Sequence, residues 1–445
     1  MKHNRLFSPF RIIIMAYTIS IGVGGLLLYW PVSQQPGVSL SFMDAVFTAT
    51  SAVTVTGLTV VNVSETFSPF GILILGLLIQ LGGIGIMSVG TLIWLATGQR
   101  INLSQRLLIM VDQNQFKFSG LVYLVKNMLG LVICIQLAGA FILGLYFLNY
   151  FDSWREAFVQ GVFTSLSAFT NSGFDLTGDS LRTFAHDYFV QGITMSLIIM
   201  GAIGFPVLVE LKEYWQNRPK EYRFSLFTKV AVRAYLVLMV LGMLFIWLLE
   251  REHAYAGLSW LDQFFYSLFH SVTARSAGLA TIDVTQFGEA TLLFISGLMM
   301  IGANPSSAGG GIRTTTLAIM FLTILAFARG RKEVHIFGRE LHQDDIRRAF
   351  IVLSLFIVIW FCSIILIIYW EKDVGLLPIL FEVSSAMGTC GLSLGITPAL
   401  SIWSKWILMV LMFIGRIGIV VLLFSMKKTE SVPRYHYPKE RIIIG

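Results

Sequence analysis

One short turn recurs four times along the chain, and it constrains the fold more than any other feature. Each copy is rich in small and hydroxyl side chains, and a glycine in it precedes a large apolar residue. The copies are Ser51-Ala-Val-Thr-Val-Thr-Gly57-Leu, Ser167-Ala-Phe-Thr-Asn-Ser-Gly173-Phe, Val272-Thr-Ala-Arg-Ser-Ala-Gly278-Leu and Ser385-Ala-Met-Gly-Thr-Cys-Gly391-Leu. Their near-regular spacing of roughly 110 residues is typical of a fourfold internal repeat.

The composition around these turns indicates a polytopic membrane protein. The 445 residues are 56% hydrophobic and 13% charged, whereas soluble domains carry roughly 25% charged residues. The net charge of +7 comes from basic residues in short segments between apolar runs, which argues against a nucleic-acid partner. Cys134, Cys362 and Cys390 lack the spacing of a metal site, so neither a zinc site nor a disulfide framework is predicted.

Eight apolar runs are long enough to cross about 30 Å of hydrocarbon. They cover residues 10–30, 70–96, 120–147, 189–212, 228–249, 291–328 (interrupted), 349–370 and 405–426. Between each odd run and the next lies an apolar segment too short to span, which we interpret as a re-entrant pore helix. The expected fold is an all-α polytopic membrane protein in which four units of span, pore helix, filter and span surround one pseudo-fourfold pore.

These units set the expected domain limits and orientation. Repeat 1 covers 1–110 with filter 54–58, repeat 2 covers 111–222 with filter 170–174, repeat 3 covers 223–340 with filter 275–279 and a gate loop at 302–313, and repeat 4 covers 341–445 with filter 388–392 and a C-terminal tail. Most lysines and arginines fall in the two termini and the loops between repeats. The positive-inside rule therefore predicts cytoplasmic termini and filter turns that open to the outside.

Each glycine turn can direct bare backbone carbonyls at a cation. Glycine permits backbone dihedrals that side chains forbid, and rings of carbonyls form a selectivity filter. A single such turn is more often an ordinary loop, but four copies in one apolar chain favour a filter. The assigned ion-binding residues are Thr54, Val55, Thr56, Gly57, Thr170, Asn171, Ser172, Gly173, Ser276, Ala277, Gly278, Gly388, Thr389, Cys390 and Gly391.

A second small-residue pattern lies in the later span of each repeat. Its copies are Gly82-Gly-Ile-Gly85, Gly201-Ala-Ile-Gly204, Gly302-Ala-Asn-Pro305 and Gly415-Arg-Ile-Gly418. Close helix packing is one interpretation. Recurrence at matched depth favours a small-residue lining below the filter, and packing stays open as a second role.

A gate is predicted where the third repeat departs from the others. The stretch Gly302-Ala-Asn-Pro-Ser-Ser-Ala-Gly-Gly-Gly-Ile-Arg313 interrupts one apolar run, and holding its proline and four glycines in a helix would cost about 7 kcal/mol relative to alanine. We expect a polar loop across the ion path, and the alternative is a simple kink. The assigned gate residues are Asn304, Pro305, Ser306, Ser307, Gly309, Gly310, Gly311, Arg313 and Arg416.

Two arginines in apolar surroundings need partners. Arg275 would repel a cation if it faced the filter, so we expect it to turn behind the filter and pair with Glu382 as a filter support, unless each finds other partners. Arg416 lies within the last apolar run, and such a charge usually faces a wet cavity. It is expected to be a cation barrier or an anchor for loop carbonyls, and the alternative is an arginine that reaches the cytoplasmic interface.

The order of span, pore helix, glycine turn and span, repeated four times, resembles the Trk/Ktr/HKT superfamily of potassium transporters. The phrases Thr273-Ala-Arg-Ser-Ala-Gly-Leu279 and Phe381-Glu-Val-Ser-Ser-Ala-Met-Gly-Thr-Cys-Gly-Leu-Ser393 carry the resemblance. With a short segment before the first span, the chain is most similar to the bacterial Ktr membrane subunits (KtrB). The resemblance implies potassium as substrate at the filter carbonyls, a homodimer in the plasma membrane, and a cytoplasmic nucleotide-binding regulatory ring (KtrA-like).

Several consequences follow from that resemblance. Nucleotide would act only through the regulatory partner, because the chain has no Rossmann or P-loop pattern. No covalent cofactor is expected, and sodium is a candidate activator. A secondary transporter with a midplane site is the main rival, and an enzyme is disfavoured because the spans lack a metal pair or an activated nucleophile. We also expect Ile442 to Gly445 to contribute to the dimer.

Overall fold

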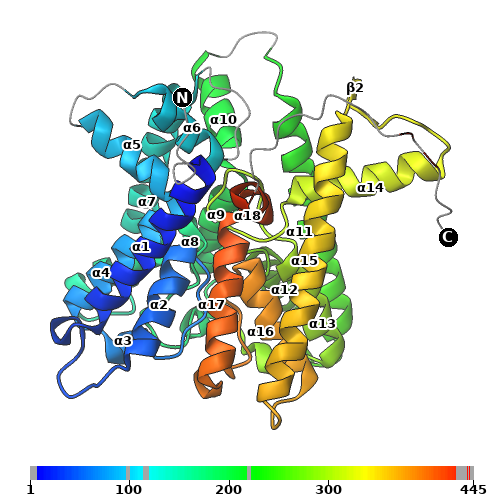
Figure 1. The fold of residues 1–445 in the computed structure, drawn as a ribbon. Coiled ribbons are helices and arrows are strands. Elements are labelled where there is room, and N and C mark those ends of the chain that lie inside the picture. The colour runs from blue at the N-terminus through cyan, green and yellow to red at the C-terminus, as the bar shows by residue number, and fades with distance from the viewer. Residues whose placement is uncertain are drawn as a thin grey trace.

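The chain forms a bundle of long and short helices, which a computed structural model shows in Figure 1. The structure describes residues 8–96, 101–113, 120–217 and 222–426, together with residues 438 and 440. The expected contribution of Ile442 to Gly445 falls outside this part. Within it, the strands His335–Ile336 (β1) and Arg339–Glu340 (β2) pair as one antiparallel hairpin. The fold is all-α, as the sequence predicts.

The helices follow one order four times: a long helix, a short helix, a turn and a second, interrupted helix. The first set is α1 (Pro9–Tyr29), α2 (Phe42–Thr54), α4 (Pro69–Ile84) and α5 (Ile86–Ala96); the second is α7 (Leu121–Phe147), α8 (Trp154–Thr170), α9 (Tyr188–Ala202) and α10 (Phe205–Asn217); the third is α11 (Leu226–Glu250), α12 (Trp260–Thr273), α13 (Glu289–Met300) and α14 (Thr314–Ala328); the fourth is α15 (Gln343–Trp370), α16 (Leu376–Gly388), α17 (Ile402–Ile417) and α18 (Ile419–Met426). Two short helices, α3 (Val63–Thr66) and α6 (Leu103–Asp112), lie in connections. In Figure 1, α14 extends sideways from the bundle, beside the end of α15.

Serine side chains mark where several of these helices begin. The hydroxyl of Ser41 accepts a hydrogen bond from the Asp44 N–H at the start of α2, and Ser259 does the same for Asp262 at the start of α12, both at 3.1 Å. Such caps satisfy backbone donors that a helix leaves without an internal partner. The start of each of these two short helices is therefore encoded locally.

Four helices in the described part are long and apolar enough to cross a membrane: α1, α7, α11 and α15. Two further pairs pass the same test jointly but are bent, α9 and α10 by 103° and α17 and α18 by 92°. The runs at 189–212 and 405–426 are thus not the continuous spans that the sequence predicts, and the run at 70–96 is also divided, into α4 and α5.

Glycine explains these breaks. Each interruption falls at the last glycine of the small-residue pattern, where Gly85, Gly204 and Gly418 have φ of 96°, 101° and 88°. Residues with a side chain rarely adopt such dihedrals. The pattern that we interpreted as a lining therefore also encodes a sharp change of direction.

The first glycine of each pattern serves close packing. A methyl group added at Gly82 would collide with the carbonyl of Val53 at the end of α2, and one at Gly415 would collide with the carbonyl of Met387 at the end of α16. Gly201 has the same relation to Phe169 at the end of α8. The packing interpretation is therefore confirmed for these three copies.

The four sets close into a ring. The second helix of each set packs against the short helix of the next: α4 contacts α8, α9 contacts α12, and α13 contacts α16. The last set completes the circle, because α17 contacts α2. This arrangement brings the C-terminal ends of the four short helices toward one common centre.

Candidate functional site

The turns that follow α2, α8 and α16 share one backbone geometry. Each begins with a residue in the left-handed region, namely Val55, Asn171 and Thr389 with φ of 57°, 57° and 50°. The next N–H then folds back to a carbonyl inside the helix, as from Thr56 to Ser51 at 2.8 Å. The same bond joins Ser172 to Ser167 and Cys390 to Ser385, both at 2.9 Å. These three turns reverse the chain in the same way.

A serine hydroxyl fixes the glycine in two of these turns. The Gly57 N–H donates to Ser51 Oγ, and the Gly391 N–H donates to Ser385 Oγ, both at 3.0 Å. Both serine side chains are fully buried. The hydroxyl-rich composition of the repeated motif therefore has a structural purpose, since it holds the glycine N–H away from the centre.

The third turn departs from this geometry, and it also has Val272 where the other copies have serine. Here α12 ends in a right-handed residue, and the N–H groups of Ala277 and Gly278 donate to the Thr273 carbonyl at 2.9 and 3.4 Å. Ser276 has φ of 101°, a conformation that costs a residue with a side chain free energy. The ring is thus only approximately fourfold.

The four filter glycines lie next to one another in a closed ring. A methyl group built on Gly57 would lie 2.9 Å from the Cα of Gly173, and one on Gly173 would lie 3.3 Å from the Cα of Gly278. The corresponding distances are 2.9 Å from Gly278 to Gly391 and 3.1 Å from Gly391 to Gly57. The approach leaves no room for side chains, so only backbone atoms can surround the centre.

The segment between α13 and α14 is an ordered loop against this ring. It runs from Ile301 to Arg313, and bonds between the Gly302 N–H and the Ile312 carbonyl and between the Ile312 N–H and the Met300 carbonyl, both 3.0 Å, close its base. Most of its residues are buried, including Asn304, Ser306, Ser307, Gly309 and Gly310. The interruption predicted at 302–313 is therefore confirmed as a break in the helix.

Backbone hydrogen bonds join the loop to the second and fourth sets. The N–H groups of Asn304 and Ala308 donate to the carbonyls of Ala202 and Gly201, both at 3.1 Å, and the Phe205 N–H donates to the Ser306 carbonyl at 2.7 Å.

On the other side, the Gly311 N–H donates to the Gly415 carbonyl at 3.2 Å. In the second set, the carbonyls of Gly201 and Ala202 can accept the bonds from the loop because α9 ends there, whereas a continuous helix would use these carbonyls internally. A kink that only fitted the span into the bundle would not need these contacts.

Side chains complete the attachment. The Asn304 Nδ2 group donates to the Ile203 carbonyl at 2.9 Å, and the Thr314 hydroxyl donates to Asn304 Oδ1. Arg313 donates to the Gly309 carbonyl within the loop. Pro305 is half-buried, and its carbonyl lies close to Gly204.

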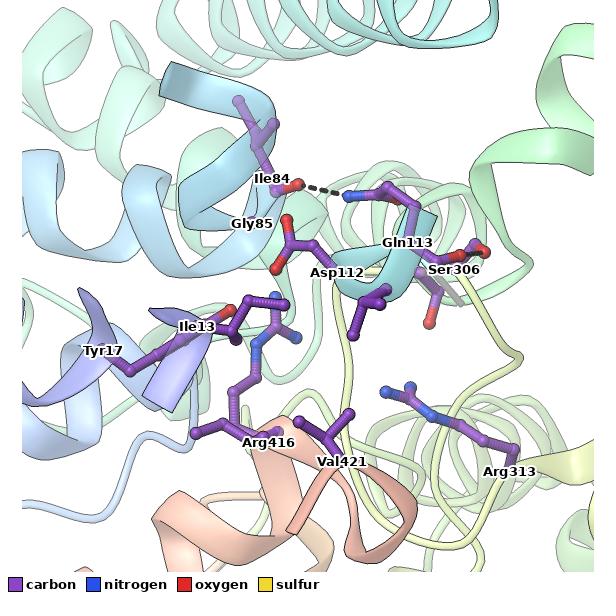
Figure 2. A pocket seen from close by; sticks show the side chains of 13 residues that line it. Ile13, Tyr17, Ile84, Gly85, Asp112, Gln113, Ser306, Arg313, Arg416 and Val421 are labelled. Atoms are coloured by element: carbon purple, nitrogen blue, oxygen red, sulfur yellow. Dashed lines mark hydrogen bonds between the residues drawn. The ribbon is translucent and has the colours of Figure 1, made fainter. Parts of the chain in front are cut away.

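Arg416 joins the loop to the first set. Its guanidinium donates to the carbonyl of Ala308 in the loop and to the carbonyls of Gly82 and Gly83 in α4, and 7% of the residue is exposed. Figure 2 shows it directed toward Asp112 across a cavity of about 30 Å³, with Arg313 also on the rim. The anchoring interpretation agrees with these contacts, whereas an arginine reaching the membrane interface does not.

The expected pair of Arg275 and Glu382 is wrong. Arg275 is fully buried, donates to the Tyr235 carbonyl at 2.8 Å and places its guanidinium 3.9 Å from the centre of the Tyr235 ring. A planar guanidinium can satisfy itself by stacking on an aromatic ring and by bonding to carbonyls. The alternative, that each residue finds other partners, is the one observed, since Glu382 also bonds elsewhere.

Glu382 supports the segment that leaves the fourth turn. It accepts hydrogen bonds from Ser393 Oγ at 2.5 Å, from the Leu394 N–H at 3.1 Å and from Thr397 Oγ1 at 3.0 Å. These donors lie two to six positions after Gly391 in the chain. The carboxylate therefore orders the exit of the turn without an arginine.

Hydrogen bonds that no sequence pattern predicts join α6 to the loop. The Ser306 hydroxyl donates to the Gln113 carbonyl, and the Gln113 amide donates to the Ile84 carbonyl at 3.1 Å and to Ser88 Oγ at 2.8 Å. A capping box between Asn102 and Gln105 marks the start of α6. This local signal does not indicate the contact between Gln113 and Ser306, which lie 193 positions apart.

Comparisons with known proteins agree with this architecture. Ktr system potassium uptake protein D of Bacillus subtilis is 52% identical over 444 residues, which cover 100% of this chain and 99% of the relative. Ktr system potassium uptake protein B of the same organism is 36% identical, covering 99% and 97%. The crystal structure of the potassium transporter TrkH from Vibrio parahaemolyticus matches with a TM-score of 0.75 at 21% identity, over 96% of this chain and 86% of that chain.

The apolar helices and these matches identify a multi-pass membrane protein. The family described as TrkH, cation transport protein, matches residues 4–434. The chain therefore belongs to the TrkH family of cation transport proteins and is a Ktr-type membrane subunit within it.

Proposed function

We propose that this protein carries potassium into the cell through one pore lined by the four glycine turns. The observation that carries the proposal is the closed ring of Gly57, Gly173, Gly278 and Gly391, where only backbone can face the centre. The ion-facing carbonyls would be those of 55–57, 171–173, 276–278 and 389–391. Relatives that are named potassium uptake proteins support potassium as the ion.

Selectivity for potassium over sodium would be weaker than in tetrameric potassium channels. Those channels have two glycines in each Thr-Val-Gly-Tyr-Gly strand, whereas each strand here has one glycine in the ring, and the third turn has a different backbone geometry. Fewer regular carbonyl rings are then available to replace the hydration shell of the ion. Sodium is a candidate activator or second substrate, and transport rather than enzymatic catalysis is the activity.

The assembly we propose follows the same resemblance. The four repeats span 1–110, 111–222, 223–340 and 341–445, with both termini cytoplasmic and the turns open to the outside. Two copies would form a homodimer in the plasma membrane. A cytoplasmic nucleotide-binding ring would regulate each dimer, and nucleotide would act through that partner alone.

The loop from Ile301 to Arg313 is the proposed gate. Its contacts with Gly201, Gly415 and the ring support this role, because a loop held there would obstruct ions that have passed the glycines. These hydrogen bonds and close approaches hold the loop together with three of the sets, so opening a path requires a force that breaks several of them at once. The regulatory ring would supply that force.

Uptake measurements test the function. Expression in a bacterial strain without its own potassium uptake systems should restore growth at low potassium, and more so with the regulatory subunit.

Deletion of residues 304–311 tests the gate. It should raise basal potassium flux and reduce the effect of the subunit. Failure to restore growth by a protein present in the membrane would contradict potassium uptake, and a folded deletion variant with normal flux and normal control would contradict the gate.

A further inference from the structure

Ser276 stands between the third turn, the fourth turn and the loop. Its hydroxyl donates to the Thr389 carbonyl across the ring at 3.1 Å and accepts the Gly310 N–H at 3.3 Å. Ser276 is fully buried, so its hydroxyl is enclosed by protein on all sides. One hydroxyl therefore connects a filter carbonyl of the fourth repeat to the backbone of the loop.

The glycines of the loop make this contact possible. A methyl group on Gly309 would collide with Ser276 Oγ, and one on Gly310 would collide with Thr389 Oγ1. The Thr389 hydroxyl itself is buried and lacks a hydrogen-bond partner among the described residues. The loop thus approaches both the third and the fourth turn at van der Waals distance, through positions that tolerate no side chain.

The other turns have no equivalent connection among the described residues. The positions that match Ser276 are Val55, Asn171 and Thr389, and none of their side chains bonds to the loop. Ser276 also has φ of 101°, far from the values near 55° of the other three. A strained residue persists where its surroundings hold it in place, and here two hydrogen bonds to different segments do so.

We propose that Ser276 couples the position of the loop to the geometry of the filter, so that discrimination between potassium and sodium changes when the loop moves. With the loop in place, the Gly310 N–H polarises the Ser276 hydroxyl and strengthens its bond to the Thr389 carbonyl. That bond fixes the direction of the carbonyl and uses one of its lone pairs. Displacement of the loop removes the Gly310 donor, frees the hydroxyl to rotate, and leaves the carbonyl able to follow an ion of a different size.

Ser276 is a positioning residue in this proposal, which rests on the filter and gate proposed above. The test is a double-mutant cycle in proteoliposomes, with the ratio of potassium to sodium flux as the readout. It compares the unaltered protein, Ser276→Ala, the deletion of 304–311 and the combination. We expect Ser276→Ala to lower the ratio on the order of threefold to tenfold, the effect of one buried hydrogen bond. The deletion should lower it comparably, and the combination should lower it no further than the deletion does.

The matched control is Ser172→Ala in the second turn. Its hydroxyl is also buried and bonds to Ser167 Oγ at 3.0 Å within the same repeat. Any change that Ser172→Ala makes in the ratio should multiply with the deletion, because that hydroxyl does not touch the loop. Independent sites behave additively in free energy, whereas coupled ones do not.

Two results would overturn the coupling: an unchanged ratio in Ser276→Ala, or effects of Ser276→Ala and the deletion that multiply. If the deletion variant does not fold, Gly310→Ala takes its place, because its methyl group would push the loop from Thr389. A deletion that leaves basal flux normal would instead contradict the gate. The coupling would then be decided by whether Gly310→Ala and Ser276→Ala change the ratio non-additively.

Discussion

Replacement of Arg416 by glutamine should open the pore in the absence of the regulatory partner. The guanidinium bonds simultaneously to Ala308 in the loop and to Gly82 in the first set, so it ties the proposed gate loop to α4. A hydrogen bond from a charged donor contributes about 1.5–3 kcal/mol. If one such bond exists only while the loop is in place, its loss shifts the loop equilibrium about tenfold to 150-fold toward the open form.

The assay is potassium flux into proteoliposomes that contain the purified membrane subunit alone. Basal flux should rise about tenfold to 150-fold, with an upper limit reached when most molecules have the loop in the open form. Arg416→Lys keeps the positive charge but offers a point donor instead of a planar fork, so it should give an intermediate flux. Unchanged basal flux in Arg416→Gln would refute the anchor, and wild-type flux in Arg416→Lys beside high flux in Arg416→Gln would show that charge alone forms the barrier.

Three further predictions concern the filter and its surroundings. Gly57→Ser should lower potassium selectivity in the flux assay more than it lowers protein abundance, because the added atoms meet the Gly173 backbone. Glu382→Gln should reduce thermal stability in detergent, and Glu382→Asp less so. In glutamine, one of the two oxygens that now accept hydrogen bonds is replaced by an NH₂ group, which can only donate. Partial burial opposes ionisation of Asp187, but hydrogen bonds from Tyr150 and two helix N–H groups lower its pKa overall. Its stabilisation is therefore present at neutral pH and is lost progressively as the pH falls below about 4, so Asp187→Asn should lower the melting temperature at neutral pH, and its difference from the wild type should shrink as the pH is lowered below about 4.

Local sequence was sufficient to predict the ring. The positions of the long helices follow from apolar length, and the four turns follow from the recurrence of glycine after hydroxyl residues. The break at 302–313 follows from the cost of proline and glycine in a helix. Each of these inferences is read from residues that are continuous in the chain or from the recurrence of a short motif, and the structure has corresponding helices and breaks.

Other features depend on contacts between distant segments. The sharp bends at Gly85, Gly204 and Gly418 were missed because two or three glycines cost a helix only about 1 kcal/mol each relative to alanine, so such an apolar run is still compatible with a straight helix. The partner of Arg275 was mispredicted because the prediction considered only an opposite charge. Packing instead places the ring and the carbonyl of Tyr235 next to the guanidinium. No local pattern could reveal that one serine hydroxyl bonds both to a carbonyl 113 positions away and to the loop.

The most direct test of the pore is to locate a heavy analogue of the transported ion. Crystals or vitrified particles prepared with thallium or rubidium in place of potassium would show where a dehydrated cation binds. The proposal predicts a peak on the axis at the centre of Gly57, Gly173, Gly278 and Gly391, and a weaker one when sodium competes. Ion density elsewhere in the molecule, with none at this centre, would contradict the assignment of these turns as the filter.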